Sequence, residues 1–340
     1  MATEIGIDLG SSKTVLFSSS KIVFEKPSAV TVDSETWEPV FFGDKAKQTL
    51  GRTPDTYECV FPIKHGVIAD YDLALAMLTN YISDTFGSKV VRPKIIATLP
   101  TGLTELQHHS LANVIEESGG RNVSVLEVPL AIAYGLDLDF STPKGHMIVD
   151  IGAGVTDIAV LSLGGIAQCD CFKTGSFDFD EQIIRFARKK HNVIIGPLTA
   201  ENIKKQIGSA IKRPLEIVMM ARGRNVFTGM PESFEITSSD VYSAIIGTAY
   251  SICNAVRKVL EKTDPDLVAD IMETGIYLSG GGALLNGMKD FMSSYIGAPV
   301  HLGSDPEHAV VKGAVAALKK PELLEKNDYQ FRSIKELVIE

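Results

Sequence analysis

The sequence predicts an α/β fold made of two related halves. Two distant segments, residues 4–17 and 147–161, share one design: an apolar strand that ends in Asp, a turn of small residues and a second strand. Strands and amphipathic helices alternate between and around them, a pattern typical of mixed sheets covered by helices. The spacing is too wide for a solenoid repeat. We therefore expect a long-range duplication with one β-hairpin in each half.

The bulk composition limits the class of protein. The chain has 340 residues, of which 45% are hydrophobic and 22% charged, so it can form a large core and more than one domain. A net charge of -9 argues against a nucleic-acid-binding protein, because such proteins carry a basic face. The same charge does not favour an anionic membrane surface. We expect no nucleic acid among the partners.

Cysteine usage and the N-terminus both indicate the cytoplasm. Only Cys169 and Cys171 lie close together, without a His or a second Cys pair, so a metal site is not expected and a reducing compartment is. The chain enters a strand at once, without the basic and apolar regions of a signal peptide. The apolar stretch 241–256 is interrupted by polar residues and predicts a packed helix rather than a membrane span.

The other elements follow from local patterns. Residues 95–99 form an apolar, strand-like run that Pro100 stops, and residues 276–278 form another that leads into glycines. Gly119 and Gly120 end the helical pattern that precedes them. Periodicity predicts helices over residues 105–118, 130–135, 180–191, 201–212 and 309–318.

The two small-residue turns are the main candidates for a phosphate site. Such a turn lets several backbone N–H groups converge on one anion. One turn of this kind also serves an ordinary hairpin, but two matched turns, each preceded by an Asp, favour ligand binding. Asp8 and Asp150 could hold a hydrated Mg²⁺ between them, because that ion keeps its waters and accepts one or two carboxylates. The alternative for either Asp alone is a turn or capping residue.

Two further segments could contact a nucleoside. Three glycines, Gly280 to Gly282, follow an apolar strand and would let a flat ligand lie against the backbone, although a strand-to-helix turn has the same composition. Glu201 and Lys204 are three residues apart on one predicted helix and so share a face. A carboxylate there can accept from ribose hydroxyls while the Lys stem lies along the base. The alternative is a solvated ion pair.

Together these segments resemble the actin, chaperone and sugar-kinase superfamily and, more specifically, the MreB-type bacterial actins. The likeness runs from about Ile5 to Leu318. The resemblance implies two α/β halves, each split into a large and a small subdomain, with ATP or ADP and Mg²⁺ in the cleft. It also implies head-to-tail assembly into paired protofilaments. Other family-typical segments follow in the family's order at residues 50–54, 66–70, 208–210, 260–263 and 279–284.

The resemblance also implies boundaries and site residues. The large subdomain of the first half would comprise residues 1–29, 70–140 and 315–340, and its small subdomain residues 30–69. In the second half, residues 141–178 and 240–314 would form the large subdomain and residues 179–239 the small one. Asp8 and Asp150 match the metal-associated acids. The nucleotide contacts would be Gly10, Ser11, Ser12, Lys13, Gly152, Ala153, Gly154, Val155, Glu201, Asn202, Ile203, Lys204, Gly280, Gly281, Gly282, Ala283 and Leu284.

Two departures from the family pattern concern the water that attacks the nucleotide. The family's Glu-Glu-Pro is Glu127-Val128-Pro129 here, and the first Thr of the second phosphate turn is Val155. Valine neither accepts a proton nor orients a hydroxyl, and losing a positioned acid–base group typically costs roughly a hundred- to ten-thousandfold in rate. We therefore expect ATP binding with slow hydrolysis. The alternative is that Glu127 or Thr156 shifts inward and restores an active ATPase, although one-residue shifts would turn strand faces over.

Milder departures concern phosphate, ribose and membrane contacts. Lys13 replaces the family's usual Asn, so it either adds a positive charge near the phosphates or points to solvent. Gln206 stands where a Glu is frequent, which puts one ribose contact in doubt. The family's apolar membrane loop corresponds to a short loop with Phe86, Val90 and Val91, so attachment to the inner face of the membrane would be weak or indirect. Paralogous bacterial actins are further candidate partners.

Two other functions use the same superfamily fold. A small-molecule kinase needs an acidic base that faces a second substrate pocket, and the sequence offers no separate candidate. A chaperone needs a peptide-binding domain, and the chain after Leu318 is too short for one. The filament function is therefore the expectation, with cell shape, wall synthesis and motility left open as the process served.

Overall fold

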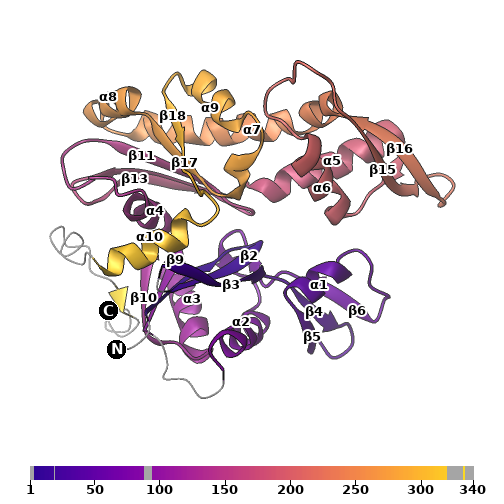
Figure 1. The fold of residues 1–340 in the computed structure, drawn as a ribbon, viewed down its shortest axis with the longest axis horizontal. Helices are drawn as coiled ribbons and strands as arrows, with labels where there is room; N and C mark the ends of the chain where they lie inside the picture. Colours follow the sequence, from indigo (N-terminus) through magenta and orange to yellow (C-terminus); the bar gives the residue numbers. More distant parts are fainter. Residues whose placement is uncertain (1–3, 19, 88–93, 320–331, 334–340) are drawn as a thin grey trace.

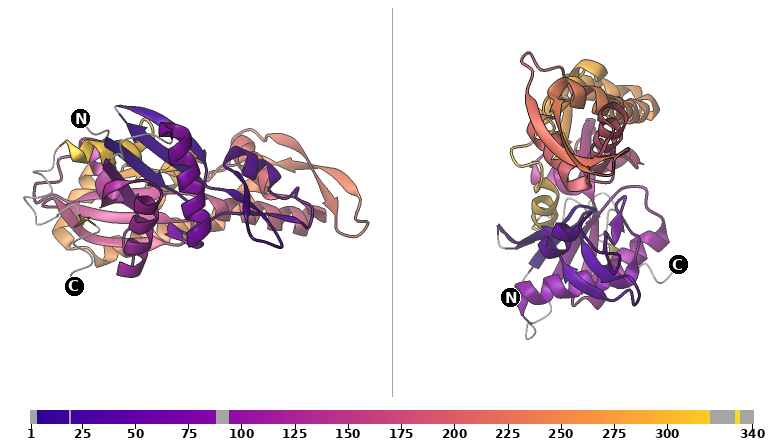
Figure 2. Two further views of the ribbon diagram at one scale, coloured as in Figure 1. Left: turned by 90° about the horizontal axis from the view of Figure 1, so that it is seen from below. Right: turned by 90° about the vertical axis from the view of Figure 1, so that its right-hand side faces the viewer.

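The computed structural model describes residues 4–18, 20–87, 94–319 and 332–333. Two halves lie one above the other, and each carries a large sheet and a small outlying sheet (Figure 1). Both small sheets lie on the same side of the molecule, in the views of Figures 1 and 2 alike. The α/β prediction is confirmed.

The large sheet of the first half has the strand order β19-β10-β9-β1-β2-β3. The strands β1, β2 and β3 form an antiparallel meander, while β9 and β10 run parallel to β1 and to each other. The helices α2 and α3 pack together beside this sheet (Figure 1). The bounds are β1 (Glu4–Leu9), β2 (Lys13–Ser18), β3 (Lys21–Pro27), α2 (Tyr71–Phe86), β9 (Lys94–Leu99), α3 (Glu105–Glu117), β10 (Arg121–Glu127) and β19 (Arg332–Ser333).

The large sheet of the second half repeats this arrangement with the order β13-β12-β11-β17-β18. The pairs β11–β12 and β12–β13 are antiparallel, and the pairs β11–β17 and β17–β18 are parallel. The predicted duplication is therefore confirmed at the level of strand order and direction. The bounds are β11 (His146–Ile151), β12 (Thr156–Ser162), β13 (Gly165–Phe172), α7 (Ser238–Lys262), α8 (Pro265–Thr274), β17 (Ile276–Ser279), η1 (Gly281–Leu284), α9 (Met288–Ile296) and β18 (Val300–Leu302).

Each small sheet carries helices, and one helix from each sheet contacts the opposite half. The first comprises β4 (Val30–Asp33), β5 (Pro39–Phe42) and β6 (Tyr57–Val60) with α1 (Asp44–Thr49), followed by the ribbon β7 (Ile63–Lys64) and β8 (Val67–Ile68). The second comprises β14 (Val193–Ile194), β15 (Val218–Asn225) and β16 (Pro231–Thr237) with α5 (Ser176–His191) and α6 (Pro197–Ile207).

The helix predicted over residues 201–212 was misplaced, because α6 begins at Pro197 and ends at Ile207. Proline suits the first position of a helix, where its missing N–H is not needed. Gly208 leaves the helical region with ψ 144 and ends the helix. The helix 309–318 is confirmed as α10 (Ala309–Leu318), and the helices predicted to start at residues 130 and 180 begin earlier, as α4 (Val128–Gly135) and α5.

Three groups of buried apolar side chains hold the molecule together. One fills each half, and the third lies between them, around α4 and α10. These two helices can approach closely because residue 313 is a glycine. A Cβ atom at Gly313 would collide with the Ala131 carbonyl. The halves are thus joined through a tightly packed helix pair. None of the helices in the described ranges has the length and apolarity of a membrane-crossing segment.

Candidate functional site

A cavity of about 870 Å³ lies between the two halves. Both predicted phosphate turns line it: Gly10, Ser11, Ser12 and Lys13 from the first half, and Gly152, Ala153, Gly154 and Val155 from the second. Each turn is closed by the same hydrogen bond, which the Gly10 N–H donates to the Lys13 carbonyl at 3.1 Å and the Gly152 N–H donates to the Val155 carbonyl at 2.9 Å.

The interior N–H groups of these turns are available to a ligand. Within the described ranges, no protein acceptor is bound by the backbone N–H groups of Ser11, Ser12, Ala153, Gly154 or Val155. The turns also lie close together: a Cβ atom built on Gly154 would stand only 3.0 Å from Ser11 Oγ. Converging free N–H groups form a nest that attracts an anion such as phosphate.

Asp8 and Asp150 occupy matching positions, each one residue before the end of its strand, and both line the cavity. Burial raises the pKa of Asp8 to about 6. Burial, together with the negative charge of Asp8, raises the pKa of Asp150 to about 7. The two carboxyls are therefore close enough to repel each other.

These acids fit a magnesium ion. Asp150 Oδ1 is buried and has no hydrogen-bond partner in the described structure. A buried oxygen without a partner is explained if it binds a cation. No group of three or more His, Cys, Asp or Glu residues with metal-site geometry is present in the described ranges. Mg²⁺ does not need one, since it is commonly held by one or two carboxylates, substrate phosphates and waters.

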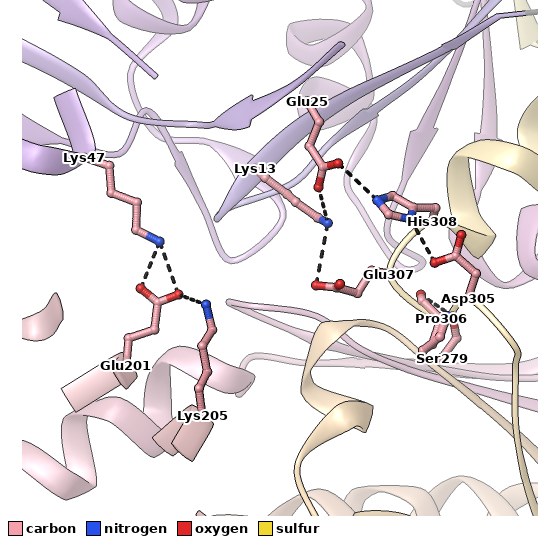
Figure 3. A network of polar contacts seen from close by, with 10 residues as sticks. All are labelled: Lys13, Glu25, Lys47, Glu201, Lys205, Ser279, Asp305, Pro306, Glu307 and His308. Atoms are coloured by element: carbon pink, nitrogen blue, oxygen red, sulfur yellow. Dashed lines mark hydrogen bonds and ion pairs between the residues drawn. The ribbon is translucent and has the colours of Figure 1, made fainter. Parts of the chain in front are cut away.

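Glu201 and Lys204, on α6, line the far end of the cavity. They do not pair with each other as the solvated-pair alternative supposed. Glu201 accepts from Lys205 at 2.7 Å and from Lys47 of α1 in the opposite half at 2.9 Å, while Lys204 bonds Asp180 at 2.8 Å (Figure 3 shows the Glu201 contacts). Burial raises the Glu201 pKa, but the two ammonium groups outweigh it and lower the pKa to about 2. A permanently ionised acceptor therefore faces the cavity.

The glycine-rich segment after β17 also reaches the cavity. Gly280, Gly281, Gly282 and Leu284 line it. Gly280 has a φ of 86°, and a Cβ atom there would collide with the Ile151 carbonyl, so glycine is required at this approach of two strand ends. The backbone rather than a side chain forms this wall.

Three predicted nucleotide contacts lie elsewhere. Ile203 and Ala283 are buried in the core of the second half. Asn202 accepts from Gln206 Nε2 at 3.0 Å and is absent from the cavity lining. They were carried over as members of continuous segments, whereas only alternate faces of a helix or turn can reach a ligand.

The positions that would handle water are both apolar walls of the cavity. Val128 and Val155 line it, whereas Glu127 and Thr156 do not. Thr156 is fully buried and its hydroxyl donates to the Thr174 carbonyl at 2.8 Å, away from the cavity. The Glu127 charge adds to the effect of burial in raising the pKa of Asp157, so its carboxyl lies on that side. In this structure neither candidate substitute has shifted inward.

Lys13 points into the cavity rather than to solvent. Its ammonium lies 2.6 Å from Glu25 and 3.6 Å from Glu307 (Figure 3), and its charge partly offsets the rise that burial causes in the pKa of Asp8. His308 extends the network, because its Nε2 lies 3.2 Å from Glu25 and its Nδ1 lies 2.8 Å from Asp305. The ammonium of Lys13 therefore lies at the cavity, where two carboxylates already pair with it.

Sequence reasoning missed several lining residues, including Thr98, Lys47, Glu25, Glu307 and Arg213. Thr98 follows from topology, because β9 pairs in parallel with β1 and places Thr98 directly beside Asp8. The others are single charged residues in unremarkable surroundings, so no local pattern marks them.

The fold agrees with comparisons to known proteins. Residues 2–326 match the family model described as MreB/Mbl protein. The chain is 35% identical over 330 residues to the cell shape-determining protein Mbl of Bacillus cereus, covering 96% of this chain and 98% of the relative. It is 34% identical over 325 residues to the cell shape-determining protein MreB of Escherichia coli K12, covering 94% of each.

Solved structures give the same result. The crystal structure of MreB5 of Spiroplasma citri bound to ADP superposes with a TM-score of 0.90 at 31% identity, covering 96% of this chain and 99% of that one. The same protein bound to AMPPNP also superposes with a TM-score of 0.90, at 30% identity. This chain therefore belongs to the MreB/Mbl family.

Proposed function

We propose that this protein binds ATP or ADP with Mg²⁺ in the cavity and assembles into actin-like filaments that serve cell shape. The pair of matched turns carries the proposal, because their free N–H groups and their aspartates face one cavity from opposite halves. The ADP and AMPPNP complexes of the Spiroplasma relative support the choice of ligand. When bound, Mg²⁺ would neutralise Asp8, Asp150 and the phosphates together.

The ligand would lie with its phosphates between the turns and its nucleoside toward α6. Glu201 provides an ionised acceptor for ribose hydroxyls, and the Gly280–Gly282 backbone provides a flat wall. Lys13 would place its ammonium group, which already pairs with Glu25, beside the phosphates. We propose slow hydrolysis, because the walls at Val128 and Val155 can neither accept a proton from water nor orient it.

Exposed apolar side chains on the β15–β16 hairpin are the proposed contact with a second copy of the chain. In the turn that joins the two strands, Phe227 is 80% exposed, Met230 is 65% exposed and Val226 is 40% exposed. Clustered exposed apolar residues of this kind are typical of contact surfaces. Family membership supports a second copy as the occupant, since the proposed product is a filament. Filaments of two protofilaments are part of the proposal.

Pelleting with ATP, with ADP and without nucleotide, followed by electron microscopy of the pellet, tests the filament proposal. We expect ATP-dependent filaments in the wild type and a several-fold smaller pellet for Phe227→Ser combined with Met230→Ser. Leu106→Ser is the matched control, because Leu106 is 76% exposed on α3 of the other half. A wild-type protein that stays in the supernatant with ATP, as a kinase would, contradicts the proposal.

Location and further partners complete the proposal. We infer a cytoplasmic protein with the four subdomains predicted from the sequence, with weak contact to the inner face of the membrane. Phe86 is partly buried against the core of the first half, which leaves little of it for lipid. Val90 and Val91 lie outside the described residues, so liposome flotation with and without their replacement by Ser is the test. Copelleting with a paralogue tests mixed filaments.

A further inference from the structure

One short turn contacts both phosphate turns at once. His65 and Gly66 join β7 to β8, in the first half. The His65 imidazole Nδ1 lies 2.8 Å from the carbonyl oxygen of Gly154, in the second half. The N–H of Gly66 donates to Ser11 Oγ at 3.2 Å, in the first half. His65 therefore reaches across the opening between the halves.

The backbone of this turn is unusual for a histidine. The φ angles of His65 and Gly66 are 49° and 73°, so both residues are left-handed, as a two-residue hairpin turn requires. Gly, Asn and Asp adopt this conformation more readily than other residues. Strained backbone positions persist where the surroundings hold them and often mark functional sites. At this strained position, the side chain that the backbone presents is an imidazole bonded to the Gly154 carbonyl.

The bond fixes the direction of the next peptide group. A carbonyl oxygen can only accept, so Nδ1 of His65 carries the proton. The Gly154–Val155 peptide is trans, because the described chain has no cis peptide bond, and its C=O and N–H therefore point in opposite directions. His65 is outside the cavity lining, whereas Val155 is part of it. Holding the carbonyl outward turns the Val155 N–H inward, where no protein acceptor meets it in the described residues.

We propose that His65 is a positioning residue that aims the Val155 N–H at the phosphate chain of the nucleotide. The inference rests on the proposed binding of ATP and deepens it, because it assigns part of the preference for a polyphosphate to a residue outside the cavity. His65 touches no part of the ligand. It acts through the Gly154 carbonyl, and it does so from the opposite half of the molecule.

Three variants separate the bond from the fold. His65→Gly keeps the left-handed turn but removes the donor. His65→Asn also suits the turn, and its amide nitrogen stands near the place of Nδ1, so it restores a donor. His65→Asp suits the turn but offers an acceptor, which repels the Gly154 carbonyl. All three residues tolerate a positive φ, so thermal unfolding of the variants should stay close to that of the wild type.

The experiment is titration calorimetry of the full chain with Mg-ATP and, separately, with adenosine. We expect His65→Gly and His65→Asp to weaken ATP about tenfold, the usual size for one charge-assisted hydrogen bond, and to leave adenosine within twofold. His65→Asn should stay within about threefold of the wild type for both ligands. This pattern requires a donor at the position of Nδ1 that acts on phosphate alone.

Each other pattern overturns the inference. Unchanged ATP affinity in His65→Gly removes the role of the imidazole. Equal weakening of ATP and adenosine, or equal weakening by Gly and Asn, shows a general structural role. Failure of the proposed function is seen separately, in the wild type: if it does not bind Mg-ATP, the ligand assignment is wrong and the inference falls with it.

Discussion

Asp8 and Asp150 destabilise the free protein at neutral pH because each is a carboxyl that its surroundings partly shield from water. Their folded pKa values of about 6 and about 7 lie above the ordinary value of 3.8. The folded state therefore binds protons that the unfolded state has already released. The stability that these protons contribute is fully present below pH 3.8 and is lost as the pH rises through 6 and 7. A bound cation would restore it.

We predict that Asp150→Asn stabilises the ligand-free protein at pH 8 by roughly 2–4 kcal/mol, because it removes a buried charge and its repulsion from Asp8. The same change should remove the Mg²⁺ dependence of ATP binding. Chemical denaturation at pH 5 and pH 8 measures the first effect, which should be small at pH 5. Asp55→Asn, at an exposed position, is the control. Equal stability of Asp150→Asn and wild type at pH 8 would contradict this explanation.

Val128 and Val155 are the residues that determine the expected hydrolysis rate. We predict that Val128→Glu combined with Val155→Thr raises phosphate release about a hundredfold, because it supplies a proton acceptor and a hydroxyl at the phosphate end. Val128→Gln with Val155→Thr is the matched control, since Gln has the same size and cannot act as a base. A phosphate-release assay with Mg-ATP measures both. Wild-type turnover equal to that of an ordinary family member would contradict the hypothesis that Val128 and Val155 slow hydrolysis.

At the scale of elements, α1 and α6 face each other across the opening of the cavity. Lys47 of α1 and Glu201 of α6 form the ion pair that joins them, and Lys205 shares the carboxylate (Figure 3). Lys47 and Glu201 side chains are about one quarter and one fifth exposed, at 27% and 21%, so solvent weakens the attraction. We expect this ion pair to hold the two halves together weakly.

We predict that Lys47→Met speeds the release of ADP by about two- to fivefold, since a partly exposed pair is worth up to roughly 1 kcal/mol. Stopped-flow displacement of a fluorescent ADP analogue measures the rate. Lys45→Met serves as the control, because Lys45 is exposed on the same helix and forms no ion pair across the opening in the described structure. Release of ADP from Lys47→Met at the wild-type rate would show that the ion pair between Lys47 and Glu201 does not influence nucleotide exchange.

The elements could be predicted from the sequence wherever period and end residues agreed. The two hairpins and α10 follow from strand patterns, apolar period and Pro306. The α6 boundary was misplaced because its apolar period runs on past Gly208, where the backbone leaves the helix. Contacts such as Lys47 with Glu201 join residues 154 positions apart, and no local pattern encodes such a pairing. The place of the two small-residue turns at one cavity was predictable because the turns are duplicated.

At the scale of the whole molecule, the duplication explains the site. Two copies of one strand-turn-strand unit face each other across the cavity, so a ligand that spans both turns must set the angle between the halves. The packed pair α4 and α10 lies at the base of this opening (Figure 1). We propose that nucleotide binding and assembly are coupled through the relative position of the halves, and we therefore expect filaments with ATP.

Calorimetric titration of purified, nucleotide-free protein with ATP, in Mg²⁺ and then in a chelator, tests the central claim most directly. We expect a single site per chain with Mg-ATP, and a loss of affinity of at least tenfold once the ion is removed, because Asp8 and Asp150 then repel the phosphates. No heat of association with Mg-ATP at several temperatures would mean that the mirrored turns do not form a triphosphate site.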